Sequence, residues 1–472
     1  MKLHNKITNK IKISAVMPVF YLGLIVMITM SSCKKILEVS PEYIRTTNQV
    51  YASDASADSV LVGLYATLSN SISYSSDIPL STGLSADELV PNPNGFSTGY
   101  ISMYNNELDP SNAQTNGFWG DSYNVVYIAN SIMEGAAASQ GMTAQKKKQC
   151  TGEAQFLRAF AYFYLVNFFG DVPLVTSTAY KTSSVLPRTA TALVYQQILK
   201  DLLSAESNLG DDYPTAGRFR ANKWVVKAML ARVYLYLGDW ADAAAKSGEV
   251  INHNAVYALG KMAADPAVMN IFHADSKEAI WQFWNSYGSA LGGYTLGDYA
   301  YFLVSQQPPT NLISAFEAGD LRSINYVGYS ATANAYYINK YKLDGSFTAN
   351  YQEYTMVFRL AEQYLIRAEA RAQQGDIGGA QADINVIRGR AGLGNTKAAD
   401  APSLLSAIGQ ERRVELCFEW GDRWLNLKRL GQLDAVMKAN KPTTWKATDA
   451  LYPIPRIEIQ NNNELTQNPG YQ

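Results

Sequence analysis

Apolar residues recur at the spacing of an amphipathic helix through most of the chain after residue 47. Residues three and four apart share one face of a helix, so this pattern predicts helices that each bury one side. The predicted helices cover residues 58–68, 118–134, 148–169, 193–209, 223–237, 240–251, 357–374, 380–390, 403–420 and 422–437. We therefore predict a mainly α-helical protein.

Three stretches lack the helical period. Residues 69–116 are rich in Ser, Asn, Pro and Gly, and they are predicted to be mostly loop. Residues from about 253 to 350 combine short apolar runs with Gly- and Tyr-rich segments, which favours loops, short strands and brief helices. The tail from Leu451 contains three prolines and is predicted to be extended. We expect residues 48–472 to form a single domain in which residues 253–350 are an irregular central insert.

A short internal repeat indicates paired helices. A Gly-Asp turn follows one predicted helix at Gly238 and another at Gly375, and small or apolar residues recur five, nine and twelve positions after each glycine. This is the pattern of tetratricopeptide-like hairpins, in which small residues let two antiparallel helices touch. A weaker copy ends at Gly170. The alternative is a set of ordinary helical hairpins without a repeat.

The first 33 residues have the layout of an export signal. Four lysines and no acidic residue precede Cys33, and an apolar stretch covers residues 13–30. Cationic, apolar and small-residue segments in this order are typical of a secretory signal peptide, and the final Cys makes it look like a bacterial lipoprotein signal. A transmembrane helix is the alternative, because the apolar stretch is near the shortest that spans a bilayer. We predict a signal peptide at residues 1–32, a lipidated tether at 33–47 and a lipid anchor on Cys33.

The net charge limits the classes of binding partner, and the cysteine content limits the possible disulfides. Cleavage before Cys33 would remove four of the 40 basic residues and none of the 41 acidic ones, leaving a net charge of −5. Nucleic acids and anionic membrane faces are bound by basic patches, so we expect no nucleic-acid partner. Cys150 and Cys417 remain, and we expect two buried free thiols. They could form a disulfide only if the fold brought them together.

Catalytic motifs are absent from the sequence. After cleavage only His253 and His273 remain, and there is no HExxH, paired CxxC, phosphate-binding Gly-rich loop or nucleophile-elbow motif. We therefore expect no enzymatic activity and no cofactor. Asp87 and Glu88 form a local acidic pair that could bind calcium. A loop pair that caps a helix or faces water is the simpler interpretation.

Arginines and carboxylates recur together on the predicted helices. They are Glu153 and Arg158, Arg359 and Glu362, Glu369 and Arg371, and the Glu411-Arg412-Arg413 run. A nearby arginine keeps a carboxylate ionised and therefore a poor general acid. We interpret these residues as buried or half-buried ion pairs that fix the register between helices.

Five blocks of sequence, in order along the chain, carry a resemblance to a known family. They are residues 153–174 (EAQFLRAFAYFYLVNFFGDVPL), 223–236, 359–393, 411–429 and 451–471. With the lipoprotein-like start, they resemble the SusD/RagB family of outer-membrane lipoproteins from Bacteroidetes. The resemblance implies a tetratricopeptide-like scaffold with an irregular, loop-rich second region packed on it. It also implies binding of oligosaccharides, or of peptides in some branches, at the cell surface.

Aromatic residues outside the helical pattern are the candidate ligand contacts. Aromatic rings stack on the apolar faces of sugars, while amides and charged groups take the hydroxyls. Helical aromatics such as Phe156 and Phe160 are expected in the core. The candidate contacts are Phe96, Tyr100, Tyr104, Trp284, Tyr287, Tyr294 and Tyr299, and a third aromatic set comprises Tyr326, Tyr329, Tyr336 and Tyr337. The resemblance implies binding loops in the same two stretches, so we expect a cleft between the Phe96–Tyr104 and Trp284–Tyr301 segments.

The predicted function follows from the anchor, the missing catalytic motifs and the resemblance. We expect a non-enzymatic, surface-exposed lipoprotein of the outer membrane that binds a glycan and passes it to a SusC-like TonB-dependent transporter. A peptide-binding protein on the same scaffold is the alternative. A surface enzyme would need an acid pair that the sequence does not reveal.

Overall fold

We describe a computed structural model of the chain, which covers residues 47–91, 98–284, 306–332, 334–341 and 353–471. The chain divides into two units at residue 50. The first unit contributes the short helix α2 (Thr47–Val50). All other elements described below belong to the second unit, residues 51–472.

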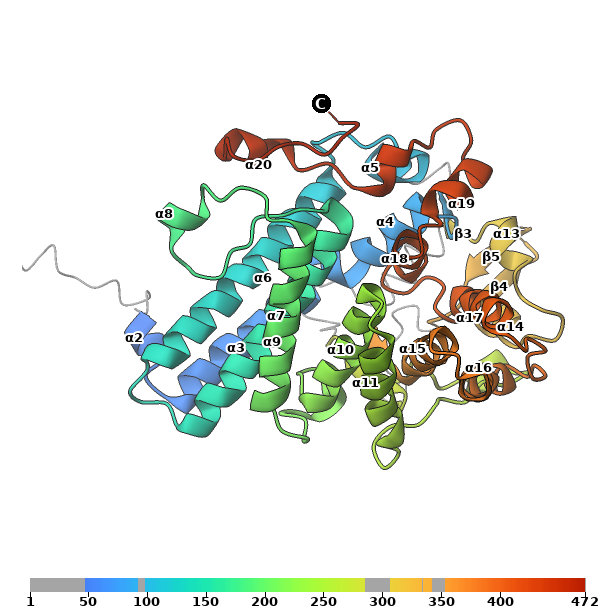
Figure 1. Cartoon of the computed structure of the whole chain (residues 1–472), viewed down its shortest axis with the longest axis horizontal. Helices are drawn as coiled ribbons and strands as arrows, with labels where there is room; N and C mark the ends of the chain where they lie inside the picture. Colours follow the sequence, from blue (N-terminus) through green and yellow to red (C-terminus); the bar gives the residue numbers. More distant parts are fainter. Residues whose placement is uncertain (1–46, 92–97, 285–305, 333, 342–352, 472) are drawn as a thin grey trace, which may run out of the picture. The chain divides into compact units, whose positions relative to one another are not determined.

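Long helices packed in sequence order form the scaffold of the second unit (Figure 1). They are α3 (Asp54–Asn70), α6 (Ala113–Ala138), α7 (Ala144–Phe169), α9 (Thr191–Asn208), α10 (Lys223–Leu237), α11 (Trp240–Asn252), α15 (Leu360–Gln373), α16 (Ile377–Arg390) and α17 (Ala401–Glu415). Consecutive helices pack as hairpins in the pairs α6–α7, α10–α11 and α15–α16, while α7 packs on α9 and α11 packs on α15. The predicted helical, tetratricopeptide-like fold is confirmed.

The Gly-Asp turns explain why the repeat is visible in the sequence. Gly238 ends α10 in the left-handed conformation, with a φ of 73°, which glycine adopts without the strain that a Cβ would cause. The backbone N–H of Asp239 then donates to the Tyr234 carbonyl at 2.9 Å, and the Asp239 side chain caps α11. Gly375 and Asp376 repeat the arrangement between α15 and α16. One dipeptide therefore ends a helix and begins the next.

The third Gly-Asp pair behaves differently. Gly170 ends α7 with a φ of 73° but a ψ of −129°, so the chain leaves the hairpin path. The Asp171 carboxylate accepts from the backbone N–H and the hydroxyl of Thr191, at 2.7 and 2.8 Å, and so caps the distant helix α9. Residues 172–190, which include α8 (Tyr180–Ser183), are thus inserted into a repeat turn. We call this segment the strap.

Buried ion pairs join elements that are far apart in the sequence, which confirms the structural role predicted for the charged residues. Arg158 pairs with Asp201 at 2.6 Å and Glu153 pairs with Arg220 at 2.7 Å. The other pairs are Arg232–Glu362, Arg429–Glu369, Arg322–Glu411, and Arg359 with Glu278, Glu415 and Glu419. Each charge is compensated inside the protein, as buried charges require.

The aromatic residues of α7 form a core with the central strands, as predicted. Trp281 is completely buried, and its ring meets the rings of Phe156 and Phe160 edge to face, at centroid distances of 5.0 Å. Cys150 and Cys417 are both buried and both free. The core is therefore held by ring packing and not by a disulfide between these two thiols.

The rest of the second unit is irregular, and its described residues form three short antiparallel strand pairs. They are β1 (Val90–Pro91) with β3 (Gln306–Gln307), β2 (Ala279–Gln282) with β6 (Met356–Arg359), and β4 (Val327–Ser330) with β5 (Ala335–Ile338). The brief helices are η3 (Ala216–Arg218), η4 (Pro266–Val268), α13 (Thr310–Ile313), α14 (Arg322–Asn325) and η5 (Ala447–Ala450). Short strands and brief helices agree with the pattern expected for residues 253–350.

The prediction that residues 69–116 are mostly loop is wrong. The segment contains the π-helical turn η2 (Ser73–Asp77), α4 (Ile78–Ser85) and α5 (Thr98–Asn105). Every residue of η2 and α4 is buried, so packing outweighs the weak helix propensity of serine and threonine. Two hydroxyls bond back to the preceding turn: Ser76 donates to the Ile72 carbonyl at 3.2 Å and Thr82 donates to the Ile78 carbonyl at 2.5 Å.

Several helices also differ from prediction. Residues 357–359 belong to β6, and α17 ends at Glu415 because Phe418 and Trp420 adopt positive φ values. The predicted helix at 422–437 is split at Gly431 into α18 (Asp422–Arg429) and α19 (Leu433–Asn440). The tail that was expected to be extended includes α20 (Arg456–Asn461), which begins directly after a proline.

Candidate ligand-binding site

The pairing of β1 with β3 joins the two stretches that the sequence marks as candidate binding segments. Val90 lies opposite Gln307, and Pro91 lies opposite Gln306. β1 lies shortly before α5, which carries Tyr100 and Tyr104, and β3 directly follows residue 305. The chain is therefore tied together beside both predicted segments, although their sequence separation exceeds 200 residues.

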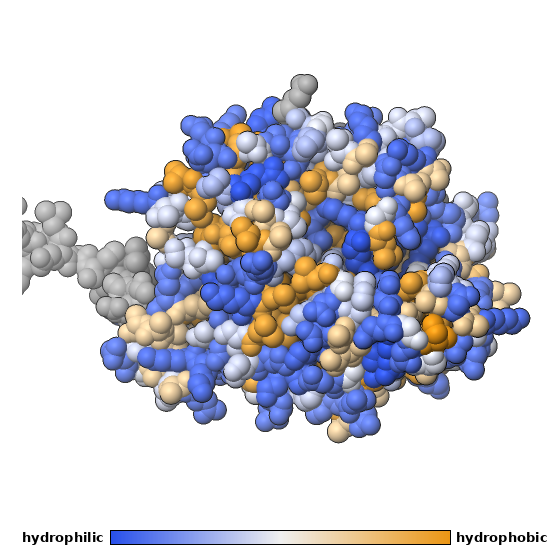
Figure 2. Space-filling model, in the orientation of Figure 1, coloured by the Kyte–Doolittle hydropathy of each residue, from blue (hydrophilic) through white to orange (hydrophobic). Residues whose placement is uncertain are grey.

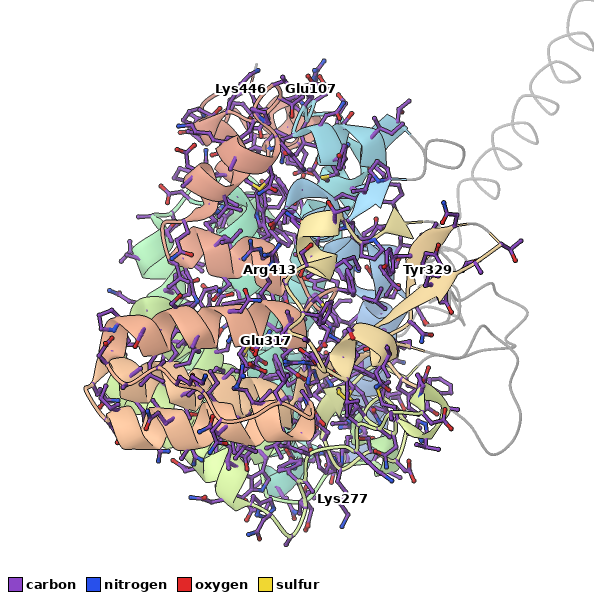
Figure 3. The ribbon with its side chains drawn as sticks, turned by 90° about the vertical axis from the view of Figure 1, so that its right-hand side faces the viewer. Glu107, Lys277, Glu317, Tyr329, Arg413 and Lys446 are labelled. Atoms are coloured by element: carbon purple, nitrogen blue, oxygen red, sulfur yellow. The ribbon has the colours of Figure 1, made fainter. Side chains whose placement is uncertain are left out.

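An exposed aromatic pair lies next to this junction. β3 packs against β5 of the β4–β5 hairpin, and Tyr329 faces Tyr336 across that hairpin. The ring centroids are 5.1 Å apart, and the two residues are 53% and 43% exposed. In Figure 3, Tyr329 lies on the hairpin, which stands away from the helices. Flat rings in this position can stack on a ligand from solvent.

Tyr100 and Tyr104 lie on helix α5, so the loop position predicted for them is wrong. Their spacing of four residues places them on one face of that helix. The Tyr100 hydroxyl donates to the Asp77 carboxylate at 2.5 Å, and the ring of Tyr104 lies 4.7 Å from the Lys441 ammonium. Both rings are half-buried and engaged by neighbours. Their contact with a ligand remains a prediction.

The Asp77 carboxylate is buried beneath this face, in the π-helical turn η2. Burial raises its pKa to about 6, and the nearby Asp121 charge adds to the rise, while the Tyr100 hydrogen bond opposes it. π-Helical turns are often found at functional sites. Here the turn directs a carboxylate toward α5 and thereby positions the Tyr100 ring.

Trp284 is the most exposed of the candidate contacts that the structure describes. Strand β2 ends at Gln282, and Phe283 is still buried, with its ring 5.3 Å from those of Trp281 and Trp420. Trp284 follows and is 53% exposed. Its side chain therefore emerges where the buried strand ends. Phe96, Tyr287, Tyr294 and Tyr299 lie outside the described residues.

The remaining tyrosines of the third aromatic set have structural roles. Tyr326 is fully buried, and its hydroxyl donates to Glu415 at 3.2 Å. The Tyr337 ring covers Gly328 on the facing strand, where any Cβ would collide with it. The exposed face of the hairpin is thus carried by Tyr329 and Tyr336.

The interpretation of Asp87 and Glu88 as a loop pair capping a helix or facing water is wrong, because both are buried. Asp87 accepts from Arg423 at 2.7 Å and from Arg413 at 3.1 Å, and these cations keep its pKa below the ordinary value despite its burial. Glu88 has no ion-pair partner in the described part of the chain, and burial raises its pKa to about 8. Neither carboxylate faces solvent, so neither is available to a ligand.

Sequence reasoning missed the residue that fixes α5 on the scaffold. The Lys441 ammonium donates to the carbonyl oxygens of Leu84 and Tyr104, each at 2.6 Å, and to the Asn106 side chain at 3.1 Å. These contacts tie the chain after α19 to both ends of the α4–α5 segment. A lone lysine in a polar stretch gives no signal of this role.

Within the described residues, no group of three or more His, Cys, Asp and Glu side chains is placed to hold a metal ion. Among the helices of the same residues, none is both long and apolar enough to span a bilayer.

The fold and this surface define a helical-repeat protein that carries exposed aromatic residues on an irregular second region. A family model described as "Starch-binding associating with outer membrane" matches residues 35–235, and one described as "SusD family" matches residues 322–471. Together the two models match most of the chain. The chain belongs to the SusD family.

Curated relatives match this chain over different lengths. The SusD-like protein P2 of Formosa agariphila is 25% identical over 506 residues, which cover 95% of this chain and 98% of the relative. The starch-binding protein SusD of Bacteroides thetaiotaomicron is 23% identical over 71% of this chain and 75% of its own length.

Solved structures show the same fold. A laminarin-binding SusD-like protein is 26% identical, with a TM-score of 0.73 over 89% of this chain and all of its own. A SusD superfamily protein from Bacteroides vulgatus reaches a TM-score of 0.76 at 20% identity, over 89% of this chain and all of the other.

Proposed function

We propose that this protein binds oligosaccharides at the surface of the outer membrane, without enzymatic activity, and delivers them to a SusC-like TonB-dependent transporter. The observation that carries the proposal is the exposed aromatic surface formed by the Tyr329–Tyr336 pair on the irregular region. Trp284, exposed where β2 ends, is a further stacking residue in the proposal.

Exposed rings on a fixed frame suit sugars for a physical reason. Sugar rings have apolar C–H faces that stack on flat side chains, and a preorganised surface loses little conformational entropy on binding. The frame is fixed here by the β1–β3 and β4–β5 pairings and by the Lys441 contacts beneath α5. Relatives named as starch-binding and laminarin-binding support the same ligand class.

The state of the carboxylates supports a non-enzymatic role. A glycosidase needs two accessible carboxyl groups on either side of the scissile bond. Among the described residues, Asp77 and Glu88 have carboxyl pKa values raised to about 6 and about 8, and both groups are buried, with Tyr100 bonded to the former. The buried carboxylates Glu415 and Glu362 are surrounded by arginines, which keep their pKa values low.

The proposed location rests on the amino-terminal sequence and the family. A lipid on Cys33 would hold the domain at the membrane through the tether at residues 33–47. The description of the matching family model, which names the outer membrane, supports this location. A channel partner in the same membrane would take up what the domain binds.

The test measures binding and turnover together. The mature chain with Cys33 replaced by serine is titrated against a panel of soluble glycans, including starch and laminarin, and against a peptide mixture. We expect binding of at least one glycan with no change in its length over time. Binding of peptides alone would favour the peptide-binding alternative and overturn the proposal, and so would glycan cleavage by homogeneous protein.

The aromatic surface is tested by substitution. Tyr329→Ala and Trp284→Ala should each weaken glycan binding several-fold to a hundredfold, because a stacked ring contributes on the order of 1–3 kcal/mol in the comparable case of nucleobases. The matched control is Tyr127→Ala on α6, where an equally exposed tyrosine lies away from the hairpin. Unchanged affinity in both test variants would show that the ligand binds elsewhere.

A further inference from the structure

A cavity lies on a different part of the molecule and shares no residue with the aromatic surface described above. Its volume is about 540 Å³, within the range of small-molecule pockets. Three segments far apart in the sequence line it: one face of α6, the strap, and the region around α20. Figure 1 shows α6, α8 and α20 around this position, and Figure 2 shows hydrophobic side chains gathered over α8 and α20.

The strap that forms one wall is pinned at several points. The Tyr123 hydroxyl donates to the Pro173 carbonyl at 2.8 Å, and the Tyr162 hydroxyl bonds to both the N–H and the carbonyl of Val175. At the far end, the Asn462 amide donates to the Leu186 carbonyl at 2.9 Å. The cavity is therefore built into the fold, because its wall is an insertion held by the half-buried Tyr123 and the buried Tyr162.

Three rings line this cavity, those of Trp119, Tyr123 and Tyr180. Trp119 and Tyr123 are four residues apart on α6 and share a face, with Gly120 beside them. Tyr180 stands at the rim and is 78% exposed. Exposure of the apolar ring surface to water is unfavourable in free energy, and a ligand that covers the ring would remove this surface from water.

Polar groups complete the lining. The Glu458 carboxylate accepts from the Trp119 indole, and burial raises its pKa above the ordinary value. Asn461, Ser183 and Ser184 also face the cavity. Among the described residues, the Asn461 amide and the Ser184 hydroxyl make no side-chain hydrogen bond. A carboxylate, an amide and a hydroxyl beside aromatic rings are the groups that recognise sugar hydroxyls.

We propose that this cavity is a second carbohydrate site, which takes one or two neutral sugar units of an oligosaccharide. The assignment rests on the proposed function for the ligand class, and it adds a separate place of binding. The lining contains no lysine or arginine, and Glu458 is its one acidic residue. An anionic ligand is therefore disfavoured, and a purely apolar ligand would leave the Asn461 amide and the Ser184 hydroxyl without a hydrogen-bond partner.

Gly120 allows the cavity to be filled without disturbing the fold. A Cβ at Gly120 would have no atom within 4 Å, and the residue lines the cavity. Gly120→Gln should therefore place a side chain in the cavity while raising the helix propensity of α6. Gly63→Gln on α3 is the matched control, because Gly63 is an exposed helical glycine that also has open space around it.

The experiment uses the mature chain and two defined probes, maltose and laminaribiose. Saturation-transfer NMR should show transfer to at least one disaccharide, loss of most of it in Gly120→Gln, and retention in Gly63→Gln. Tyr180→Ala should weaken the same binding several-fold. Absence of transfer to both probes, or transfer unchanged in Gly120→Gln, would overturn the second site.

The same variants separate this inference from the proposed function. Binding of a polymeric glycan that is weakened by Trp284→Ala and untouched by Gly120→Gln, with no disaccharide signal, would leave the proposed function standing without the second site. A parent protein that binds no glycan of the panel would refute both. A polymer affinity lowered by each variant alone, and further by the two together, would support two sites on one chain.

Discussion

Replacement of Glu88 by glutamine should stabilise the protein at neutral and alkaline pH. The Glu88 side chain is buried, with 2% of the residue exposed, and its Oε1 has no hydrogen-bond partner among the described residues. Burial raises its pKa from 4.5 to about 8, with Arg423 opposing the shift and Asp87 adding to it. The folded state therefore holds a proton that the unfolded state releases. The stability linked to this proton is complete below pH 4.5 and is lost as the pH rises through about 8.

The size of the effect follows from the shift. A difference of about 3.5 pKa units corresponds to about 5 kcal/mol once the pH exceeds both values. Glutamine has the shape of the protonated acid and no proton to lose, so Glu88→Gln should remove up to that penalty at pH 8 and almost none at pH 5. The raised pKa of Asp77, about 6, lowers the stability of both parent and variant as the pH rises from about 4 to 6. Variant and parent are therefore compared at the same pH, so that this effect cancels.

The assay is urea unfolding of parent and Glu88→Gln at pH 5, 6.5 and 8, with the exposed Glu107→Gln as a control for the substitution itself. We expect the variant to gain stability over the parent progressively with pH, and the control to gain none. A difference between variant and parent that is the same at pH 5 and pH 8 would refute the assignment of a buried, protonated Glu88.

Three further changes test the scaffold and the anchor. Gly375→Val should lower the free energy of unfolding by about 1–2 kcal/mol or more, because a φ of 78° strains any side chain there although space is open. The control Gly378→Ala, at a helical position with equal space, should not lower it. Equal urea midpoints for Gly375→Val and the parent would contradict the repeat turn. Arg158→Met should cost about 3–5 kcal/mol in urea unfolding, because it leaves Asp201 buried without its cation. Cys33→Ala should release the protein from the membrane fraction or leave it unprocessed, and a membrane-bound product cut at the same site would contradict lipidation.

The scaffold could be predicted because its signals are local. Helical periodicity reports a face that some neighbour must cover, whichever neighbour that is. The Gly238-Asp239 and Gly375-Asp376 turns could be read directly, because one residue takes the left-handed conformation and the next caps a helix. The serine-rich stretch at 73–85 was misread for the opposite reason. Its helices form because neighbours distant in the sequence bury them, and composition carries no record of those neighbours.

The candidate surface could be predicted only as a density of aromatic residues. The sequence does not show that Asp77 accepts a hydrogen bond from Tyr100. Nor does it show that the Tyr337 ring packs over Gly328 while Tyr336 stays exposed. The sequence contains one sign of the cavity beside the strap. Gly170-Asp171 repeats the turn dipeptide, yet the next predicted helix begins only at Leu193, whereas a true repeat would begin a helix directly after the turn. A broken repeat of this kind marks an insertion.

Substitutions in the buried frame and in the proposed ligand-contacting surface differ in how much they lower the free energy of unfolding. Glu278 and Lys340 attach the irregular region to the helices through Arg359 and the Glu415 carbonyl, at 2.9 and 2.8 Å. Removal of one partner from such a buried network leaves an uncompensated charge, so these positions resist change. Tyr329 is half exposed, and its truncation would leave no cavity and no unpaired buried group. On the proposed function, exchange of exposed rings would alter which sugar is bound while the free energy of unfolding stays almost constant.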